Sequence, residues 1–150
     1  MKKILVINGP NINALGWREP EIYGVRTYAD LVDFIGRAAL EIGVEAQCFQ
    51  SNSEGRLIDE IQGALERFDG IVINPAAYTH TSIAIPDALK AVGLPAVEVH
   101  LTDIAGREAY RRISYTSEAC LAVVKGKGFE GYREALQILM AAWAGKSVEK

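Results

Sequence analysis

Two ionisable side chains, Glu98 and His100, occur two residues apart at the end of the apolar run 96–99. Side chains two apart in a strand point to the same face, so we expect these two to be neighbours. A carboxylate inside a parallel strand is costly to bury unless it is paired. Glu98 would therefore bond one ring nitrogen of His100 and leave the other for proton transfer. An exposed strand end with a solvated glutamate is the alternative.

A second candidate is Tyr23, in the segment 15–24, which also carries Arg18 and has glycines near both ends. Loops of this composition often act as lids. A free tyrosine has a pKa of about 10, so a tyrosine base that is largely ionised at pH 7 needs roughly 4 kcal/mol of stabilisation. A nearby guanidinium supplies such stabilisation, and Arg18 is the local source. An ordinary packed loop tyrosine is the alternative.

Further polar side chains fall on or just beyond the ends of the predicted strands. Asparagine, aspartate and histidine bind hydroxyl groups, and arginine binds a carboxylate through two hydrogen bonds. Together they suit a small, rigid acid that is rich in oxygen, although each one alone could simply form a turn. The residues are Asn11, Asn13, Asn74, His80, Asp87 and Arg111.

The elements that must position these residues alternate along the chain. Short apolar runs at 4–7, 44–49, 71–73, 96–99 and 121–124 alternate with helical periodicity at 28–42, 57–68, 84–92 and 132–143. This order is typical of a parallel sheet with helices on both faces. Five strands in a chain of this size predict an α/β flavodoxin-like three-layer sandwich with a five-stranded parallel sheet and strand order 2-1-3-4-5.

Local signals support the element boundaries. Thr27 and Asp30 resemble a capping box, and Gly43 is placed to end the first helix in a left-handed conformation. Three long polar loops, 8–26, 74–82 and 100–117, leave the carboxyl ends of strands. Ligands bind at that edge of an open α/β sheet, where the strand order reverses.

Composition limits the possible classes of protein. The chain has 150 residues, 49% of them hydrophobic, which fits one catalytic domain over residues 1–150 with a frayed polar tail from about 144 to 150. The net charge of -3 argues against a nucleic-acid surface, which needs a basic excess.

The two cysteines, Cys48 and Cys120, lie in apolar runs far from any Cys/His cluster, so we expect reduced thiols and no metal site. No segment approaches the roughly 20 apolar residues of a membrane span, and the first apolar run is too short for a signal peptide. We therefore expect a cytoplasmic protein that does not insert into a membrane.

One motif suggests a nucleotide cofactor. Gly126, Gly128 and Gly131 match G-x-G-x-x-G between a predicted strand and a predicted helix. The dinucleotide fingerprint also requires a further strand and an acidic residue about 20 positions on, whereas only 19 residues follow Gly131. A flavin phosphate loop would need hydroxyl side chains, and residues 9–16 contain no Ser or Thr. We expect a glycine-rich turn and no cofactor.

Taken in order, several segments resemble the type II 3-dehydroquinate dehydratases over residues 4–143. The matching segments are NGPNIN at 8–13, REPEIYG at 18–24, QSNSEG at 50–55, INPAAYTHTS at 73–82 and VEVHL at 97–101. Independent motifs in the right order make this a specific match, beyond a likeness of fold.

The resemblance implies a lyase of the shikimate pathway that dehydrates 3-dehydroquinate to 3-dehydroshikimate without metal or cofactor. It implies that Tyr23 takes a proton from C2, beside the ketone, and that Arg18 helps to keep Tyr23 ionised. The resulting enolate would be stabilised through a water near Asn11. His100, oriented by Glu98, would then protonate the leaving C1 hydroxyl.

The same resemblance implies a substrate-binding set and an assembly. The binding residues would be Asn74, His80, Asp87, Leu101, Thr102 and Arg111. The subunit would be flavodoxin-like, and twelve copies would assemble as four trimers. Neither composition nor spacing indicates that assembly.

Several positions depart from the family pattern. Ala76 stands where glycine is usual, which restricts the backbone there. Pro86 replaces a common Arg, so we expect the third helix to begin close to Pro86, a change that could move Asp87. The other departures are Ser53 for His, Asp103 for Asn, and the residues 105–106. These changes bear on substrate affinity and assembly contacts more than on the proton carriers.

Two other classes remain open from the residues alone. A flavodoxin-like nucleotide or flavin binder is disfavoured by the missing phosphate loop. A non-catalytic assembly protein on the same fold leaves no reason for Arg18, Tyr23, Glu98 and His100 to occur together.

Overall fold

A single parallel sheet forms the centre of the protein. The computed structural model describes residues 1–17, 21, 25–103 and 108–145. Its strands are β1 (Lys3–Asn8), β2 (Glu45–Gln50), β3 (Gly70–Asn74), β4 (Ala96–His100) and β5 (Ala122–Lys125). They pair in parallel in the order β2-β1-β3-β4-β5. The predicted fold class and strand order are confirmed.

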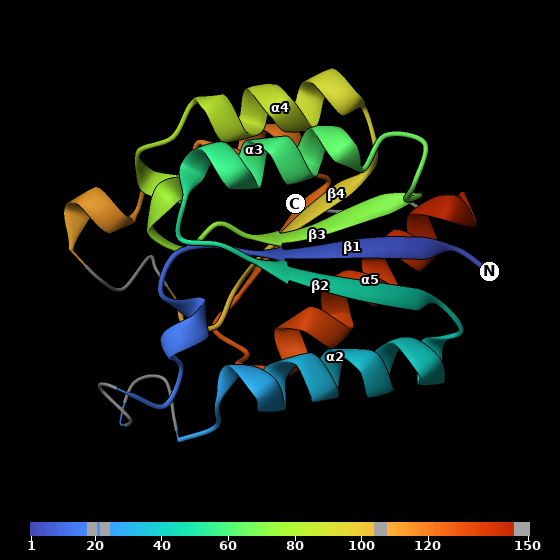
Figure 1. Cartoon of the computed structure of the whole chain (residues 1–150), viewed down its shortest axis with the longest axis horizontal. Coiled ribbons are helices and arrows are strands. Elements are labelled where there is room, and N and C mark those ends of the chain that lie inside the picture. The colour runs from blue at the N-terminus through green and yellow to red at the C-terminus, as the bar shows by residue number, and fades with distance from the viewer. Residues whose placement is uncertain (18–20, 22–24, 104–107, 146–150) are drawn as a thin grey trace.

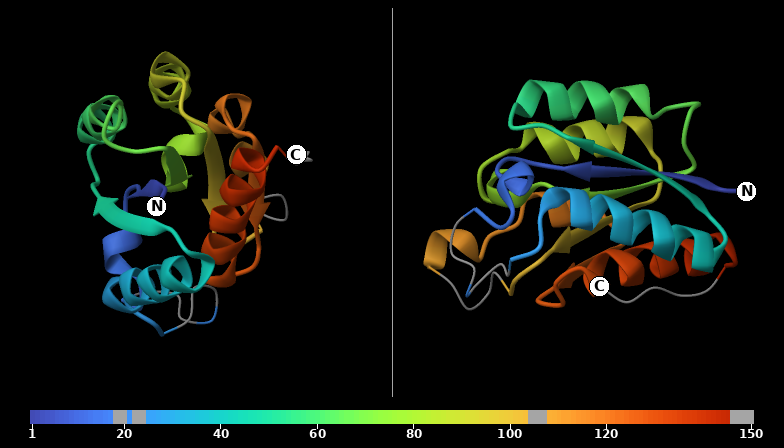
Figure 2. Two further views of the ribbon diagram at one scale, coloured as in Figure 1. Left: turned by 90° about the vertical axis from the view of Figure 1, so that its right-hand side faces the viewer. Right: turned by 60° about the horizontal axis from the view of Figure 1, so that its bottom comes forward.

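Two helical layers enclose the sheet. Helices α2 (Tyr28–Ile42) and α5 (Glu130–Trp143) cover one face, and α3 (Glu54–Gly63) and α4 (Ala84–Val92) cover the other (Figure 1). The two further views in Figure 2 show the same three layers. Short 3-10 helices, η1 (Ile12–Ala14), η2 (Ala76–His80), η4 (Ala109–Arg111) and η5 (Thr116–Ala119), occupy the connections. None of the helices in these described ranges is long and apolar enough to cross a membrane.

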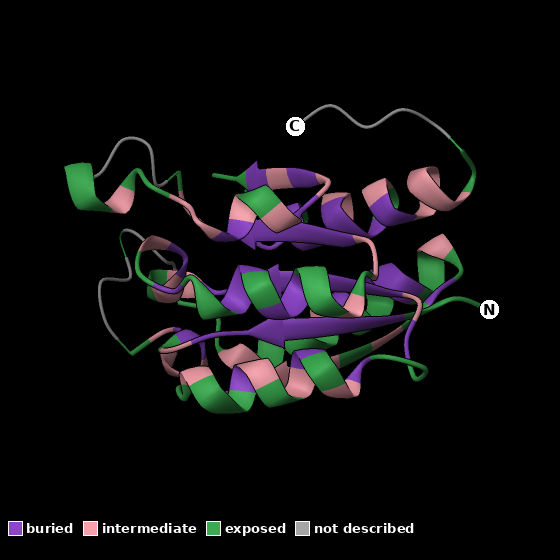
Figure 3. Cartoon of the chain, turned by 90° about the horizontal axis from the view of Figure 1, so that it is seen from above, coloured by how far each residue is buried: buried purple, intermediate pink, exposed green. Residues whose placement is uncertain are grey.

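Alternate residues of the strands feed two hydrophobic cores. In β1, Ile4 and Val6 pack beneath α2 and α5, whereas Leu5 and Ile7 pack beneath α3 and α4. The three central strands β1, β3 and β4 are therefore buried on both faces (Figure 3), whereas no residue of the edge strand β2 is fully buried. Burial on both faces explains why these three strands are mostly apolar.

The predicted limits of α2 are confirmed in detail. Thr27 Oγ1 accepts from Asp30 N at 3.2 Å, and Asp30 Oδ2 accepts from Thr27 N at 2.8 Å, which completes the capping box. Gly43 ends the helix with φ of 90°, a left-handed conformation that glycine adopts without strain.

Helix α3 differs from its prediction at both ends. It begins at Glu54, three residues earlier than predicted, because Ser53 Oγ caps it by accepting from Arg56 N at 3.3 Å. It ends at Gly63 and not at Phe68. Beyond that end, Glu66 has φ of 70°, a left-handed conformation that turns the backbone, and Phe68 is buried in the core.

Helix α4 begins at Ala84, so Pro86 is its third residue. A proline is tolerated in the first turn because backbone N–H groups there have no partner within the helix. The expected start close to Pro86 is confirmed.

Candidate active site

The loops that follow β1, β3 and β4 enclose a pocket at the carboxyl edge of the sheet, toward the left in Figure 1. This edge lies where the strand order reverses between β1 and β3, as predicted. The lining residues are Pro10, Asn11, Ile12, Ala14, Leu15, Gly16, Asn74, Ala76, Ala77, His80, His100, Leu101, Thr102 and Arg111.

Most of the candidate residues meet at this pocket. Those that line it are Asn11, Asn74, His80, His100, Leu101, Thr102 and Arg111. Glu98 lies directly behind His100 and is fully buried. Asn13 instead takes part in a bond with Gln50, which lies 3.3 Å away.

Three further candidates are not placed in this pocket. Asp87 is exposed in the first turn of α4 and does not line it. Arg18 and Tyr23 lie outside the described residues. Their segment follows directly on Leu15 and Gly16, which do line the pocket.

Glu98 and His100 form a buried pair on the α3/α4 side of the sheet. Glu98 Oε2 hydrogen-bonds His100 Nε2, which confirms that the two side chains share a face. His100 is only 4% exposed but reaches the pocket wall. Its second ring nitrogen, Nδ1, is therefore the one that can meet a bound molecule, which suits a proton donor of fixed orientation.

Two hydroxyl groups also hold the Glu98 carboxylate. Thr79 Oγ1 donates to Glu98 Oε2 at 2.8 Å, and Ser114 Oγ lies 2.9 Å from each carboxylate oxygen. A buried carboxylate with several hydrogen-bond donors is held in one position. Sequence reasoning missed both residues. Thr79 belongs to the quoted segment 73–82, whereas no local signal marks Ser114.

His80 and Arg111 also line the pocket. His80 Nδ1 lies 2.6 Å from the carbonyl oxygen of Ile113, which only accepts, so Nδ1 carries a proton. Arg111 Nε forms an ion pair with Glu108 Oε2 at 3.0 Å. Because Arg111 lines the pocket, its guanidinium is placed to bind an acidic group there.

The loop that carries Asn11 is held by residues at the end of β2. Asn11 has φ of 70°, a left-handed conformation that asparagine tolerates, and its N–H donates to Asn52 Oδ1 at 3.0 Å. Gln50 Nε2 donates to the Gly9 carbonyl at 3.1 Å. These contacts give a role to the quoted segment 50–55, for which the sequence had suggested none.

The ends of β1 and β3 come unusually close beside the pocket. Gly9 N donates to the Asn74 carbonyl at 2.7 Å. A Cβ at Gly9 would lie 2.6 Å from the carbonyl oxygen of Pro75, so a larger residue would push the two loops apart. The glycine therefore allows the two strand ends to form one wall.

The glycine-rich motif after β5 forms the turn into α5. Gly126 and Gly128 have φ of 78° and 58°, and a Cβ at Gly131 would lie 3.2 Å from Val99 Cγ2. These glycines allow a tight turn and a close approach of α5 to the sheet, and they do not line the pocket. Within the described residues, no group of three or more His, Cys, Asp or Glu side chains is arranged to hold a metal ion.

Comparisons with known proteins agree on one family. The family model described as "Dehydroquinase class II" matches residues 2–140. The chain is 54% identical over 137 residues to the 3-dehydroquinate dehydratase of Geotalea daltonii, covering 91% of this chain and 95% of that protein. It is 57% identical over 130 residues to that of Clostridium acetobutylicum, covering 87% and 90%.

Solved structures give the same result. The type II dehydroquinase of Butyrivibrio crossotus superimposes with a TM-score of 0.90 at 48% identity, covering 93% of this chain and 97% of that chain. The type II dehydroquinase of Propionibacterium acnes superimposes with a TM-score of 0.87 at 42% identity, covering 91% and 94%.

Proposed function

The chain belongs to the type II 3-dehydroquinate dehydratase family, and from this premise we propose how its pocket removes water from 3-dehydroquinate. The activity is that of a shikimate-pathway lyase in aromatic biosynthesis, which yields 3-dehydroshikimate. The observation that carries the proposal is the buried Glu98–His100 pair, which reaches a pocket lined by seven of the expected residues.

His100 is the proposed acid. The bond to Glu98 holds the imidazole in place, so that Nδ1 can deliver a proton to the leaving oxygen. In the elimination the C1–oxygen bond breaks, the leaving hydroxyl takes the proton from His100, and water departs. The electron pair of the enolate forms the C1–C2 double bond.

Tyr23 is the proposed base, and Arg18 the residue that keeps it ionised. The phenolate would take the C2 proton, and the electron pair of the broken C–H bond would pass to the ketone oxygen as an enolate. Neither residue lies in the described part of the chain, so their assignment rests on the motif at 18–24. The segment directly follows residues of the pocket wall, which supports the proposal.

The remaining pocket residues suit the polar groups of the substrate. Arg111 would pair with an acidic group, and Asn74, His80, Leu101 and Thr102 would bind oxygens. Asn11 would hold a water against the enolate oxygen. A fixed donor aimed at developing charge is an effective form of catalysis, because no reorganisation is needed during the reaction.

Asp87 requires a different account because it lies outside this pocket and is exposed. We propose that it meets substrate in the pocket of a neighbouring subunit of a dodecamer built as four trimers. Exposed apolar side chains at Ile83, Tyr110 and Ile113 support a subunit contact on this side.

A single catalytic domain in the cytoplasm completes the proposal. One sheet carries all the described strands. Burial raises the pKa of the Cys48 thiol to about 11. A thiol with so high a pKa is inert at neutral pH, which suits a reducing compartment.

The test is a direct assay, because the product is a conjugated enone carboxylate that absorbs in the ultraviolet. We expect absorbance to rise when 3-dehydroquinate is added to the pure protein. Tyr23→Phe should retain the fold and substrate binding but lose most turnover, at least about 100-fold. Unchanged absorbance with the wild-type protein would overturn the proposed activity, and near-normal turnover of Tyr23→Phe would mean that another group is the base.

His100→Ala separates the two proton transfers. It should release no product at a useful rate yet still exchange the C2 hydrogen of the substrate for deuterium in D2O, because the base is intact. Loss of both exchange and release would contradict the division of roles.

A further inference from the structure

A chain of hydrogen bonds runs beneath the pocket, on the α2/α5 side of the sheet. Asn74 Nδ2 donates to the Tyr132 hydroxyl at 2.9 Å, and that hydroxyl donates to Asn8 Oδ1 at 2.6 Å. Asn8 and Tyr132 are fully buried, and Asn74 is 2% exposed. Of these three residues, only Asn74 lines the pocket. The hydrogen bonds therefore connect helix α5 with the pocket wall through the side-chain amide of Asn74.

The direction of each bond follows from the groups involved. The backbone N–H of Ala76 can only donate, and it donates to Asn74 Oδ1 at 3.0 Å. The Asn74 amide must then present Nδ2 to Tyr132. The phenol accepts that bond and sends its own proton to Asn8. The orientation of the amide is therefore determined at both ends, and a second Nδ2 proton is left over.

Two features keep the Tyr132 hydroxyl in this place. Gly131 allows α5 to lie close to the sheet, because a side chain there would crowd Val99 at 3.2 Å and Val124 at 3.4 Å. Burial also raises the pKa of the Tyr132 phenol, so that it stays protonated throughout the working pH range. The protonated hydroxyl of Tyr132 can therefore donate to Asn8 Oδ1 and accept from Asn74 Nδ2 over that whole range.

We propose that Tyr132 is a positioning residue for substrate binding, which acts through Asn74 by holding its side-chain amide with Nδ2–H toward the pocket. The remaining N–H would donate to an oxygen of 3-dehydroquinate. A rotated amide would present its carbonyl oxygen, which cannot donate. This inference rests on the proposed function and deepens it by adding a buried residue of α5 to the binding site.

The first test is Tyr132→Phe, which removes the hydroxyl and keeps the ring. We expect KM for 3-dehydroquinate to rise about tenfold while kcat stays within about twofold, because Asn74 contributes to binding and not to proton transfer. The pH profile of kcat should not change. Leu139→Val on the same helix is the matched control, since Leu139 is fully buried and has no polar group.

The second test places Tyr132→Phe in an Asn74→Ala background. If Tyr132 acts through Asn74, the double variant should have the KM of Asn74→Ala alone, whereas independent effects would multiply. Should Tyr132→Phe fail to fold, Asn8→Ser tests the chain from its other end. It weakens the acceptor of the phenol proton, and a KM rise of about threefold is expected.

A KM for Tyr132→Phe equal to that of Leu139→Val would overturn the inference, and so would multiplied effects in the double variant. Both results require an active wild-type enzyme. An inactive wild-type protein would instead overturn the proposed function, so the two failures are distinguishable.

Discussion

Glu98 is the residue on which the proposed chemistry of the pocket depends, although it does not line the pocket itself. Its carboxylate is fully buried and bonded by His100, Thr79 and Ser114. A buried charge is tolerated only when its hydrogen-bonding positions are filled. Three partners fill those positions here, so the proposed acid, His100, is held in place by a residue that lies behind it and does not line the pocket.

Glu98→Gln should therefore lower kcat far more than it raises KM. The amide cannot stabilise a protonated imidazole, and a loss on the order of 100-fold in kcat is expected. Steady-state kinetics across pH would measure it. Glu118→Gln is the control, since Glu118 is an exposed carboxylate on η5. Equal kcat values for the two variants would contradict the role of Glu98.

Ala76 offers a test of backbone strain at the same site. It has φ of 52°, in the left-handed region, which costs an alanine about 1–2 kcal/mol. Ala76→Gly removes that strain but adds freedom to the unfolded chain, worth about 0.5–1 kcal/mol. We expect a net gain of up to about 1 kcal/mol in the free energy of unfolding, measured by denaturant titration. Destabilisation would show that the alanine methyl makes packing contacts worth more than the strain.

At the scale of elements, the helices were predictable wherever a local signal marks their ends. Helix α2 has both its capping box and its terminal glycine, and its predicted limits are correct. Helix α3 was misplaced because Ser53 was seen only as a departure from a family motif, although it caps the helix. The amphipathic pattern alone does not locate an end, because the apolar spacing continues to Phe68 although the helix ends at Gly63.

The capping box of α2 predicts a pH-dependent stability. The Thr27 backbone N–H bonds the Asp30 carboxylate and lowers the pKa of Asp30 below its usual value. The stabilisation is therefore present above the pKa of the unfolded chain, near 4, and is lost as the pH falls through the folded pKa. Asp30→Asn should be less stable than wild type at pH 7, and the gap should narrow below about pH 4.

Chemical denaturation at a series of pH values would measure that difference. Asp33→Asn in the same helix leaves the capping box intact and serves as the control. A gap between Asp30→Asn and wild type that stays constant from pH 7 to pH 3 would contradict the assignment.

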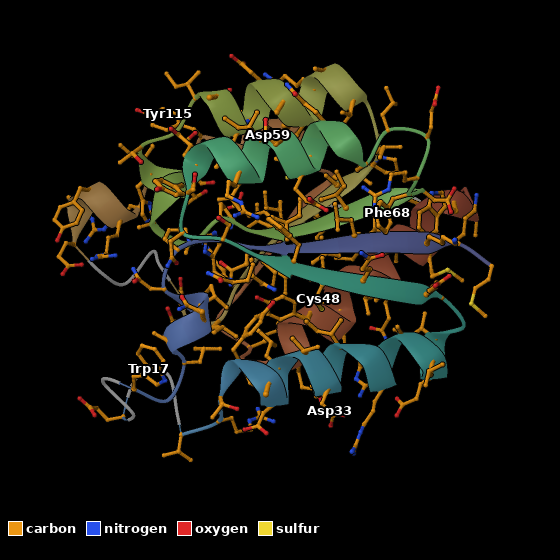
Figure 4. The ribbon with its side chains drawn as sticks, in the orientation of Figure 1. Trp17, Asp33, Cys48, Asp59, Phe68 and Tyr115 are labelled. Carbon is orange, nitrogen blue, oxygen red and sulfur yellow. The ribbon has the colours of Figure 1, made fainter. Side chains whose placement is uncertain are left out.

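At the scale of the whole molecule, the two ends of the sheet have different roles. The carboxyl ends of the strands carry the pocket, and the opposite end closes the cores. In Figure 4, Trp17 lies toward the carboxyl ends of the strands, and Phe68 lies toward their opposite ends. Asp87 is exposed and lies outside the pocket of its own subunit. In the proposed assembly, each pocket would therefore need residues from two subunits.

Subunits that lack Asp87 should be rescued by subunits that lack His100. Refolding Asp87→Ala together with His100→Ala in equal amounts should restore activity in roughly a quarter of the pockets, if each pocket draws on two neighbouring subunits at random. Turnover of the mixture, with its size checked by sedimentation, measures the effect. His100→Ala mixed with Glu98→Ala is the control, because both residues belong to one subunit's pocket.

A mixture that stays inactive while Asp87→Ala alone is inactive would place the action of Asp87 within its own subunit. Full activity of Asp87→Ala alone would remove it from the binding set.

The sequence by itself determined the features that depend on near neighbours along the chain. Alternation of strands and helices specified a parallel three-layer sheet, and the two-residue spacing placed Glu98 and His100 on one face. Glycine and proline positions predicted the turn into α5 and the start of α4. These signals are readable because secondary structure has a short, fixed period.

Only the tertiary structure decided which distant side chains meet. Ser114 reaches Glu98 across 16 positions, and Tyr132 reaches Asn74 across 58 and Asn8 across 124. Each contact depends on how a helix or loop packs against the sheet, which the periodicity of one segment does not encode. The proposed proton donor was thus visible in the sequence, whereas the groups that hold Glu98 and Asn74 in position became visible only once the layers had packed together.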